Sequence, residues 1–442
     1  MVACAAASCG GDDDGVLTVW TNESQPDRMK ATEAILADFS KKTRIKTELV
    51  PVPEDSLATL TINAAAAGEL PDVVLATPIG DSHVYAKEQL FDAEAAQKVV
   101  ERLGKDTFSE RALSLVSNDG VATGVPSDGW GQLLIYRRDL FDEAGLEAPQ
   151  TLEDVRAAAE KLNADSVAGI VLGTAPGDAF TAETFEHIGL AFGCGLVDER
   201  GEVTFDSPEC VEALEWYGDL AKNYSVEGSQ TLESTRATYF AGEAAMMFWS
   251  PFLLDGMAGL RADTKPTCPE CKRDPYFLAE HSGLVGPLRG TSGDPKQFGS
   301  ISTFNISVDA NTKRAQKLVE YMMSEGYPRW LALSPQGKYP VRLGDEDDPR
   351  RFAKAWAELE SGVQRKVPLR EVYSRASIAS LAEGVRTFDR WGFEQGQGAL
   401  VGALSAEQPI ATAVADVIGG DDPAAVAEET QRTIEEIQAS AN

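Results

Sequence analysis

The sequence contains six cysteines, which could bind a metal ion, form disulfides or remain free thiols. Cys268 and Cys271 form C-P-E-C, which could supply half of a zinc site. The other half would have to come from Cys194 and Cys210, which are spaced unlike a zinc knuckle, and the chain has only three histidines. Two disulfides, Cys194–Cys210 and Cys268–Cys271, are the simpler interpretation in an oxidising compartment, with free thiols or a metal site as alternatives.

The remaining cysteines, Cys4 and Cys9, lie near the start of the chain. Small residues, Ala6-Ala7-Ser8, precede Cys9, and two glycines and three aspartates follow it. This pattern is similar to the processing site of exported bacterial lipoproteins, in which the cysteine is lipidated and a flexible polar tether follows. The basic and apolar parts of such a signal are missing, so either the sequence starts late or the match is chance.

Familiar catalytic motifs are missing from the sequence. It contains no G-x-S-x-G, no P-loop, no H-E-x-x-H and no G-x-G-x-x-G after a predicted strand. Glycosidases need only a pair of carboxylates, and with 70 acidic residues some pair is inevitable. The sequence therefore favours binding over catalysis, with no cofactor and no metal, and leaves a sugar hydrolase as the less favoured alternative.

Composition and charge narrow the possible partners. The 442 residues are 43% hydrophobic and 25% charged, as in ordinary globular proteins, and the length suggests two or three domains. The net charge of -30 repels nucleic acids and anionic membrane surfaces. No apolar run approaches the roughly 20 residues of a membrane-spanning helix.

The first part of the chain alternates strand and helix signals. We expect strands at 16–20, 45–52 and 72–77, separated by helices at 27–42 and 56–71. This order is typical of a parallel α/β sheet.

The later segments continue this alternation of strands and helices, up to a region with few predicted strands. Buried strands are expected at 132–136, 168–174 and 304–310, and a helix at 151–162 begins with Thr151 as N-cap and Asp154 three residues on. A second helix, at 207–223, has Ser207 as cap and Pro208 in its first position. From about 350 onward the sequence indicates mostly helices, the last at 424–439.

Several segments, taken in their order, resemble one family. The most specific are "YRRDLFDEAGLEAPQTLED" (136–154) and "YFAGEAAMMFWSP" (239–251). In this the chain is similar to the extracellular solute-binding proteins of ABC importers, in the cluster that includes maltose- and other sugar-binding proteins. The resemblance implies an α/β, two-lobed periplasmic-binding-protein fold of type II, with crossing hinge segments and the ligand in the cleft.

The resemblance also implies a division of the chain. Residues 1–15 would be a truncated signal with its lipidation site and tether. Lobe 1 would comprise 16–126 and 283–334, and lobe 2 would comprise 127–282 and 335–442. The stretch 263–297, which contains C-P-E-C, is longer and richer in Pro and Gly than expected there and blurs one of these boundaries.

A site for a sugar or polyol needs polar groups for the hydroxyls and flat aromatic rings for the C–H faces. In α/β sheets such groups gather at the strand ends that face the crevice. By this rule the candidate ligand-binding residues are Asn22, Glu23, Thr77, Asp81, Asp128, Trp130, Asp178 and Phe180. Further candidates are Trp249, by its match to a stacking aromatic of sugar-binding relatives, Ser300 and Ser302, by their place at the return crossing, and Tyr373, Arg375 and Trp391 of the helical tail.

Structural alternatives remain open for several of these residues. Helix capping could explain the polar residues after the strands at 16–20 and 72–77. Hinge packing could explain Trp130, core packing could explain Trp249 and Trp391, and a surface salt bridge could explain Arg375.

The resemblance implies a binding protein that captures a carbohydrate or polyol and delivers it to the permease of an ABC importer. The protein would be a monomer outside the cytoplasm, held at the membrane only through a lipid on Cys9. A binding protein for a non-sugar solute, such as a polyamine or a phosphate ester, is the alternative.

Overall fold

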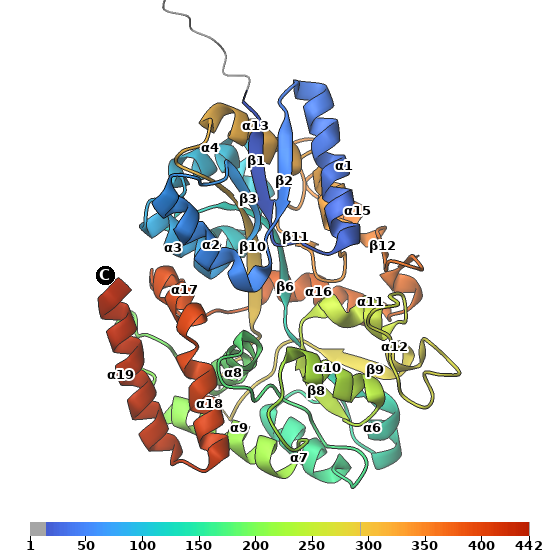
Figure 1. Ribbon diagram of the computed structural model, residues 1–442. Coiled ribbons are helices and arrows are strands. Elements are labelled where there is room, and N and C mark those ends of the chain that lie inside the picture. Colours follow the sequence, from blue (N-terminus) through green and yellow to red (C-terminus); the bar gives the residue numbers. More distant parts are fainter. Residues whose placement is uncertain (1–14, 292, 442) are drawn as a thin grey trace, which may run out of the picture.

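The computed structural model describes residues 15–291 and 293–441. Two lobes, each built on its own β-sheet, lie one above the other in Figure 1. The lipidation site expected at Cys9 lies outside the described residues. The two-lobed α/β architecture expected from the sequence is confirmed.

The first lobe starts with the predicted alternation of strands and helices. Strands β1 (Leu17–Thr21), β2 (Thr47–Pro51) and β3 (Val73–Pro78) are joined by α1 (Pro26–Thr43) and α2 (Glu54–Ala67). Strand β1 pairs in parallel with both β2 and β3. The carboxyl ends of these strands therefore meet at one edge of the sheet.

Three antiparallel strands complete this sheet. They are β6 (Val125–Gly131), β10 (Gly299–Ile306) and β11 (Tyr339–Pro340), and the full order is β11-β6-β10-β3-β1-β2. The strand expected at 304–310 is the end of β10, which pairs antiparallel to β3 and to β6. The other elements of this part are α3 (Ile79–Lys87), α4 (Ala93–Leu103), α5 (Glu110–Val116), β4 (Ser117–Asn118), β5 (Val121–Ala122), α13 (Thr312–Met322), α14 (Tyr327–Leu331) and α15 (Arg351–Ala357).

The second lobe has a smaller, wholly antiparallel sheet. Its strands are β7 (Leu133–Arg137), β8 (Met246–Trp249) and β9 (Ser282–Val285), with β7 in the middle. Its helices are α6 (Arg138–Ala144), α7 (Leu152–Leu162), α8 (Ala179–Phe192), α9 (Pro208–Asn223), α10 (Leu232–Ala241), α11 (Leu254–Met257) and α12 (Phe277–His281). The predicted cap of α7 by Thr151 and the cap of α9 by Ser207 are both present.

The prediction of a strand at 168–174 is wrong. This buried segment makes only isolated bridges, from Ala168 to Ala244 and from Val171 to Met247. Glycine at 169 packs so closely on α7 that an added Cβ would lie 2.0 Å from the carbonyl oxygen of Ala159. The apolar run therefore reflects burial beneath a helix, and not a ladder of strand pairs.

Two chain segments carry strands from one sheet into the other. Strand β6 ends at Gly131 and β7 begins at Leu133, so the single residue Gln132 separates the sheets. The residues between β9 and β10 make the return connection. The lobe limits expected at 126/127, 282/283 and 334/335 stay a prediction; strand pairing puts residues 127–131 and 339–340 in the six-stranded sheet.

The C-terminal part is mainly helical, as predicted, and touches both lobes. The short β12 (Glu360–Ser361) and β13 (Val367–Pro368) precede α16 (Arg375–Thr387), α17 (Gly398–Glu407), α18 (Pro409–Gly419) and α19 (Pro423–Ala441). Helix α17 packs on α3, whereas α18 packs on α8 and α9 (Figure 1). The contact between α17 and α3 needs glycine, because a Cβ on Gly402 would lie 2.5 Å from the carbonyl oxygen of Gly80.

Both predicted disulfides, Cys194–Cys210 and Cys268–Cys271, are present. The described residues contain no group of three or more His, Cys, Asp and Glu side chains placed to hold a metal ion. In the same part of the chain, every helix is too short or too polar to span a bilayer.

The two disulfides differ in the length of chain that they close. The sequence separation is 16 for Cys194–Cys210 and 3 for Cys268–Cys271, and a longer closed loop restricts the unfolded chain more. Replacing Cys194 and Cys210 by alanine is expected to lower the free energy of unfolding by about 3 kcal/mol. The same change at Cys268 and Cys271 is expected to cost about 2 kcal/mol. Urea denaturation of both variants checks this order, and a larger loss in the short-loop variant would contradict it.

Candidate functional site

A cavity of about 490 Å³ lies between the two lobes. One wall comes from the loops after β1 and β3, from α1 and α2, and from Lys338 before β11. The opposite wall comes from α8, α10 and the loops that follow β8. The residues that line it include Asn22, Glu23, Arg28, Glu54, Trp130, Gln132, Phe180, Glu183, Arg236, Trp249, Phe252, Asp255, Arg261, Asp263, Ser300, Ser302 and Lys338.

Lys338 is a buried charge on the lobe 1 side of this cavity. Its side chain is 1% exposed, and its Nζ lies 2.5 Å from Glu23 Oε1 and 3.2 Å from Asp128 Oδ1. Asp128, equally buried, also accepts hydrogen bonds from Trp330 Nε1 and from the hydroxyl of Ser127, both at 2.7 Å. Every charge in this cluster therefore has a partner of opposite sign, as burial requires.

Glu23 is held by two cations at once. Its second oxygen, Oε2, lies 2.5 Å from Arg28 Nη1. Burial alone would raise the pKa of Glu23, but the charges of Lys338 and Arg28 outweigh it and lower the pKa to about 2. Burial would likewise lower the pKa of Lys338, and the carboxylates of Asp128 and Glu23 raise it instead. Glu23 and Lys338 are therefore both ionised at neutral pH.

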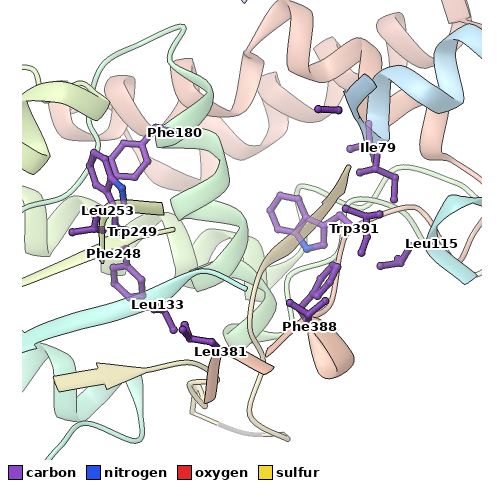
Figure 2. Close-up of a cluster of buried hydrophobic side chains, with 14 of the residues drawn as sticks. Ile79, Leu115, Leu133, Phe180, Phe248, Trp249, Leu253, Leu381, Phe388 and Trp391 are labelled. Atoms are coloured by element: carbon purple, nitrogen blue, oxygen red, sulfur yellow. The ribbon is translucent and has the colours of Figure 1, made fainter. Parts of the chain in front are cut away.

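Aromatic rings form apolar surfaces on the cavity wall. Trp249, at the end of β8, packs against Phe180 of α8 with ring centroids 4.9 Å apart. Figure 2 shows these two rings together, with Phe248 of the same strand nearby. On the crossing strand β6, Trp130 packs on Phe298 with centroids 5.7 Å apart. Phe180 and Trp249 are only 5% and 4% exposed, whereas Trp130 is half-buried and offers the more open surface to a carbon skeleton.

Gln132, the residue between the two sheets, has an unused donor. Its side chain is fully buried, and its Oε1 accepts a hydrogen bond of 3.1 Å from Nδ1 of His187. The residue lines the cavity, and its buried Nε2 has no hydrogen-bond partner among the described residues. Since an unpaired buried donor is costly, this amide is suited to a ligand oxygen.

A second group of charges connects the lobes at the cavity. Arg261 lies 2.9 Å from Asp263, 3.7 Å from Asp255 and 3.9 Å from Asp27 of α1. Burial raises the pKa of Asp255, and the charge of Arg261 opposes that rise. The contact with Asp27 joins a lobe 2 loop to a lobe 1 helix. On the same side Arg28 lies over the ring of Phe252 at 5.6 Å.

The cavity brings together half of the residues predicted from the sequence to bind a ligand. Glu23 is already occupied by Lys338 and Arg28, whereas Ser300 and Ser302 lie on β10 beside the crossing strand. The predicted residues that line the cavity are Asn22, Glu23, Trp130, Phe180, Trp249, Ser300 and Ser302. Their role in binding stays a prediction.

Other predicted residues have structural partners instead of a place on the cavity. Asp128 belongs to the cluster around Lys338. Asp178 caps α8 by accepting from the backbone N–H of Phe180 and also accepts from that of Leu232. Thr77 is fully buried in β3, where its carbonyl accepts from the hydroxyl of Thr303.

The remaining predicted residues also lie off the cavity. The Tyr373 hydroxyl donates to the carbonyl of Leu254, and the indole of Trp391 donates to the carbonyl of Cys194, so both serve the core. Arg375 is exposed at the first position of α16. Asp81 lies in the first turn of α3, where burial and the charge of Glu54 raise its pKa to about 7.

Several residues of the cavity wall were not among those predicted from the sequence. Arg28, Gln132, Glu183 and Lys338 all line the wall. Glu183 had a usable signal, because it follows Phe180 by one helical turn and shares its face of α8. Lys338 had no local sequence signal, because its partners Asp128 and Glu23 lie 210 and 315 positions away in the sequence.

Comparison with known proteins identifies the class to which this fold and cleft belong. Residues 22–327 match the family described as bacterial extracellular solute-binding protein. Because the match covers more than half of the 442 residues, the chain belongs to this family, as its sequence resemblance predicted.

Individual relatives agree over nearly the whole chain. The putative ABC transporter periplasmic-binding protein YcjN of Escherichia coli (strain K12) is 28% identical over 422 residues, which is 90% of each chain. Maltose-bound MalE3 of T. maritima has a TM-score of 0.72 at 19% identity, covering 96% of this chain and 100% of that one. A solute-binding protein from Agrobacterium radiobacter K84 in complex with ribitol has a TM-score of 0.69 at 17% identity, covering 96% and 99%.

Removing the buried cation tests the charge cluster. Lys338→Met leaves Asp128 and Glu23 buried without their shared partner, although Glu23 keeps Arg28. We expect the free energy of unfolding at neutral pH to fall by about 3 kcal/mol. Because the folded pKa of Glu23 is about 2 and its ordinary value is 4.5, this stabilisation is present above about pH 4.5 and is lost as the pH falls toward 2. The difference between variant and wild type should therefore shrink on acidification.

Urea denaturation at neutral pH and at about pH 3 measures both effects. Lys98→Met is the matched control, since Lys98 makes an exposed ion pair with Glu94 on α4 and should change stability by less than about 0.5 kcal/mol. Equal losses in the two variants would contradict the assigned role of Lys338.

Proposed function

We propose that this chain captures a carbohydrate or polyol in its interlobe cleft and delivers it to the permease of an ABC importer. The observation that carries the proposal is the composition of the cavity wall, in which aromatic rings occur together with an amide group that has no hydrogen-bond partner among the described residues. Trp130 and Trp249 supply the rings, and Gln132 supplies the unpartnered donor. A ligand with hydroxyls at its edge and C–H groups on its faces needs both.

The serine hydroxyls of β10 extend the polar part of the wall. Ser300 and Ser302 pair with Trp130 and Asp128 of β6, and both serines line the cavity. A hydroxyl both donates and accepts, so these serines can bond sugar hydroxyls in either sense. Asn22, at the end of β1, adds an amide from the neighbouring loop.

Closure of the lobes around the ligand follows from the placement of these groups. Asn22 comes from lobe 1, Phe180 and Trp249 come from lobe 2, and Gln132 stands on the connection. A ligand that contacts all of them favours the arrangement in which the lobes are close together. The permease would then recognise the closed form, and no bond of the ligand would be made or broken.

The relatives support this class of ligand and of partner. The Escherichia coli relative is named a putative ABC transporter periplasmic-binding protein, and the two solved neighbours hold maltose and ribitol. We propose further that the protein is a monomer held outside the cytoplasm by a lipid on Cys9, because the residues around Cys9 suit a lipidation site followed by a tether.

A ligand panel tests the class of solute. Neutral sugars and polyols are expected to raise the melting temperature, because a ligand at a hundred times its Kd adds about 2.7 kcal/mol to the free energy of unfolding. A thermal-shift screen with spermidine, putrescine and glycerol phosphate as the competing class is the measurement. Stabilisation only by polyamines or phosphate esters would overturn the proposal, and so would a new product after incubation with a sugar.

Removing one aromatic surface tests the site itself. Trp130→Ala is expected to weaken binding of the best neutral ligand from that screen about tenfold, because the ring covers apolar ligand surface. Trp130→Phe should recover part of the loss. Isothermal titration calorimetry measures both affinities.

The control for this experiment is Trp20→Ala. Trp20 is a half-buried tryptophan of β1 that packs beside the cluster of Val52, Leu57 and Tyr85, outside the cavity wall. Its replacement should leave the affinity within about twofold. Loss of affinity in Trp20→Ala equal to that in Trp130→Ala would show that general destabilisation, and not ligand contact, explains the effect.

A further inference from the structure

Glu183 is the acidic side chain of the cavity wall that the protein itself leaves unmatched. It lies on α8, one turn after Phe180, and is half-buried. Among the described residues its carboxyl has no hydrogen bond and no ion pair. We propose that the solute of this cleft carries a protonated amino group, as in an amino sugar or an amino polyol, and that Glu183 is its counter-ion. This inference rests on the proposed function and narrows its ligand class.

The cations of the cavity wall cannot serve Glu183, because each already has another partner. Lys338 and Arg28 are bound to Glu23. Arg261 is paired with Asp263, and Arg236 is paired with Glu233 on its own helix. The cavity therefore presents an acidic group with no cation of its own to any solute that enters.

The charges that face Glu183 are mostly of its own sign. Among the described residues Arg390 is the cation whose charge acts on Glu183, and its Nε is bound at 2.9 Å to Glu186, one turn along α8. Asp178 and Glu186 face Glu183 from α8 and its cap, and Glu54 faces it from α2 of the other lobe. Burial is the main cause that raises the pKa of Glu183 to about 8; Arg390 opposes this shift and the three carboxylates add to it.

Acidic side chains that act on one another are also found in lobe 1. Glu54 also faces Asp81 of α3, and burial together with this charge raises the pKa of Asp81 to about 7. Carboxyl groups of both lobes thus approach one another at one end of the cleft. Because the pKa values of Glu183 and Asp81 are raised to about 8 and about 7, these two groups hold protons over part of the neutral range. A bound ammonium group would replace the proton of Glu183 and stabilise the closed arrangement.

An organic amine fits this environment better than a metal ion does. No group of three metal-ligating side chains exists among the described residues. Next to Glu183 stands the ring pair of Phe180 and Trp249, which can cover a carbon skeleton and attract a cation through the ring faces. The free amide of Gln132 can bond a hydroxyl of the same ligand.

Paired ligands make the test specific for the amino group. Glucosamine, galactosamine and mannosamine are each titrated by calorimetry against glucose, galactose and mannose, using the full chain. At least one amino sugar should bind more tightly than its neutral counterpart, by about ten- to hundredfold, the range of a hydrogen bond between charged groups. At about pH 6.5, where Glu183 holds a proton in the free protein, titration in buffers of different ionisation enthalpy should show release of nearly one proton per ligand.

Glu183→Gln is the decisive variant, because it keeps the size of the side chain and removes the charge. It should abolish the preference for the amino sugar and the proton release, so that the amino sugar and its neutral counterpart bind with similar affinity. Glu212→Gln, on the exposed face of α9, makes the same change in net charge and should alter neither.

The outcomes of these experiments distinguish failure of this inference from failure of the proposed function on which it rests. Neutral sugars or polyols that bind at least as tightly as the amino sugars would overturn the inference and leave the proposed function standing. A preference for the amine that survives Glu183→Gln would also overturn it. Failure of every sugar, polyol and amino sugar to bind would overturn both.

Discussion

The antiparallel pairing of β6 with β10 is the interaction on which the two-lobed structure depends. Both strands belong to the large sheet, and each leads to the smaller one, β6 through the single residue Gln132 and β10 through the longer segment that follows β9. The two strands approach each other so closely that a Cβ on Gly299 of β10 would lie 2.6 Å from the carbonyl oxygen of Trp130 on β6. A paired connection lets the lobes rotate without separating.

The buried charges around Lys338 fix the lobe 1 wall of the cleft at this junction. Asp128 is part of β6, Lys338 precedes β11, and Glu23 follows β1, so one ammonium group joins three strands of the sheet. Such a cluster is a costly way to gain stability, because each ion loses its hydration. Its geometry is the compensation: the paired charges favour a single arrangement of the side chains that form this part of the cavity wall.

The sequence predicted local structure better than it predicted the site. Strand and helix order, the caps at Thr151 and Ser207, both disulfides and the family follow from short patterns. Site residues depend on which strand end faces the cleft, and that is set by pairings across hundreds of positions. The rule for strand ends therefore found Trp130 and Ser300 but could not separate them from Asp128, whose partner Lys338 has no local signal.

The same connection that joins the lobes also carries residues that line the cavity. Trp130, Gln132 and Ser300 all lie on or beside the crossing strands, so a solute that contacts them touches the part of the chain that must bend. Groups far from the hinge, such as Glu54 and Glu183, face each other from opposite lobes. A ligand bound at both places couples the angle between the lobes to its own shape and charge, and selectivity then depends on how fully the lobes close.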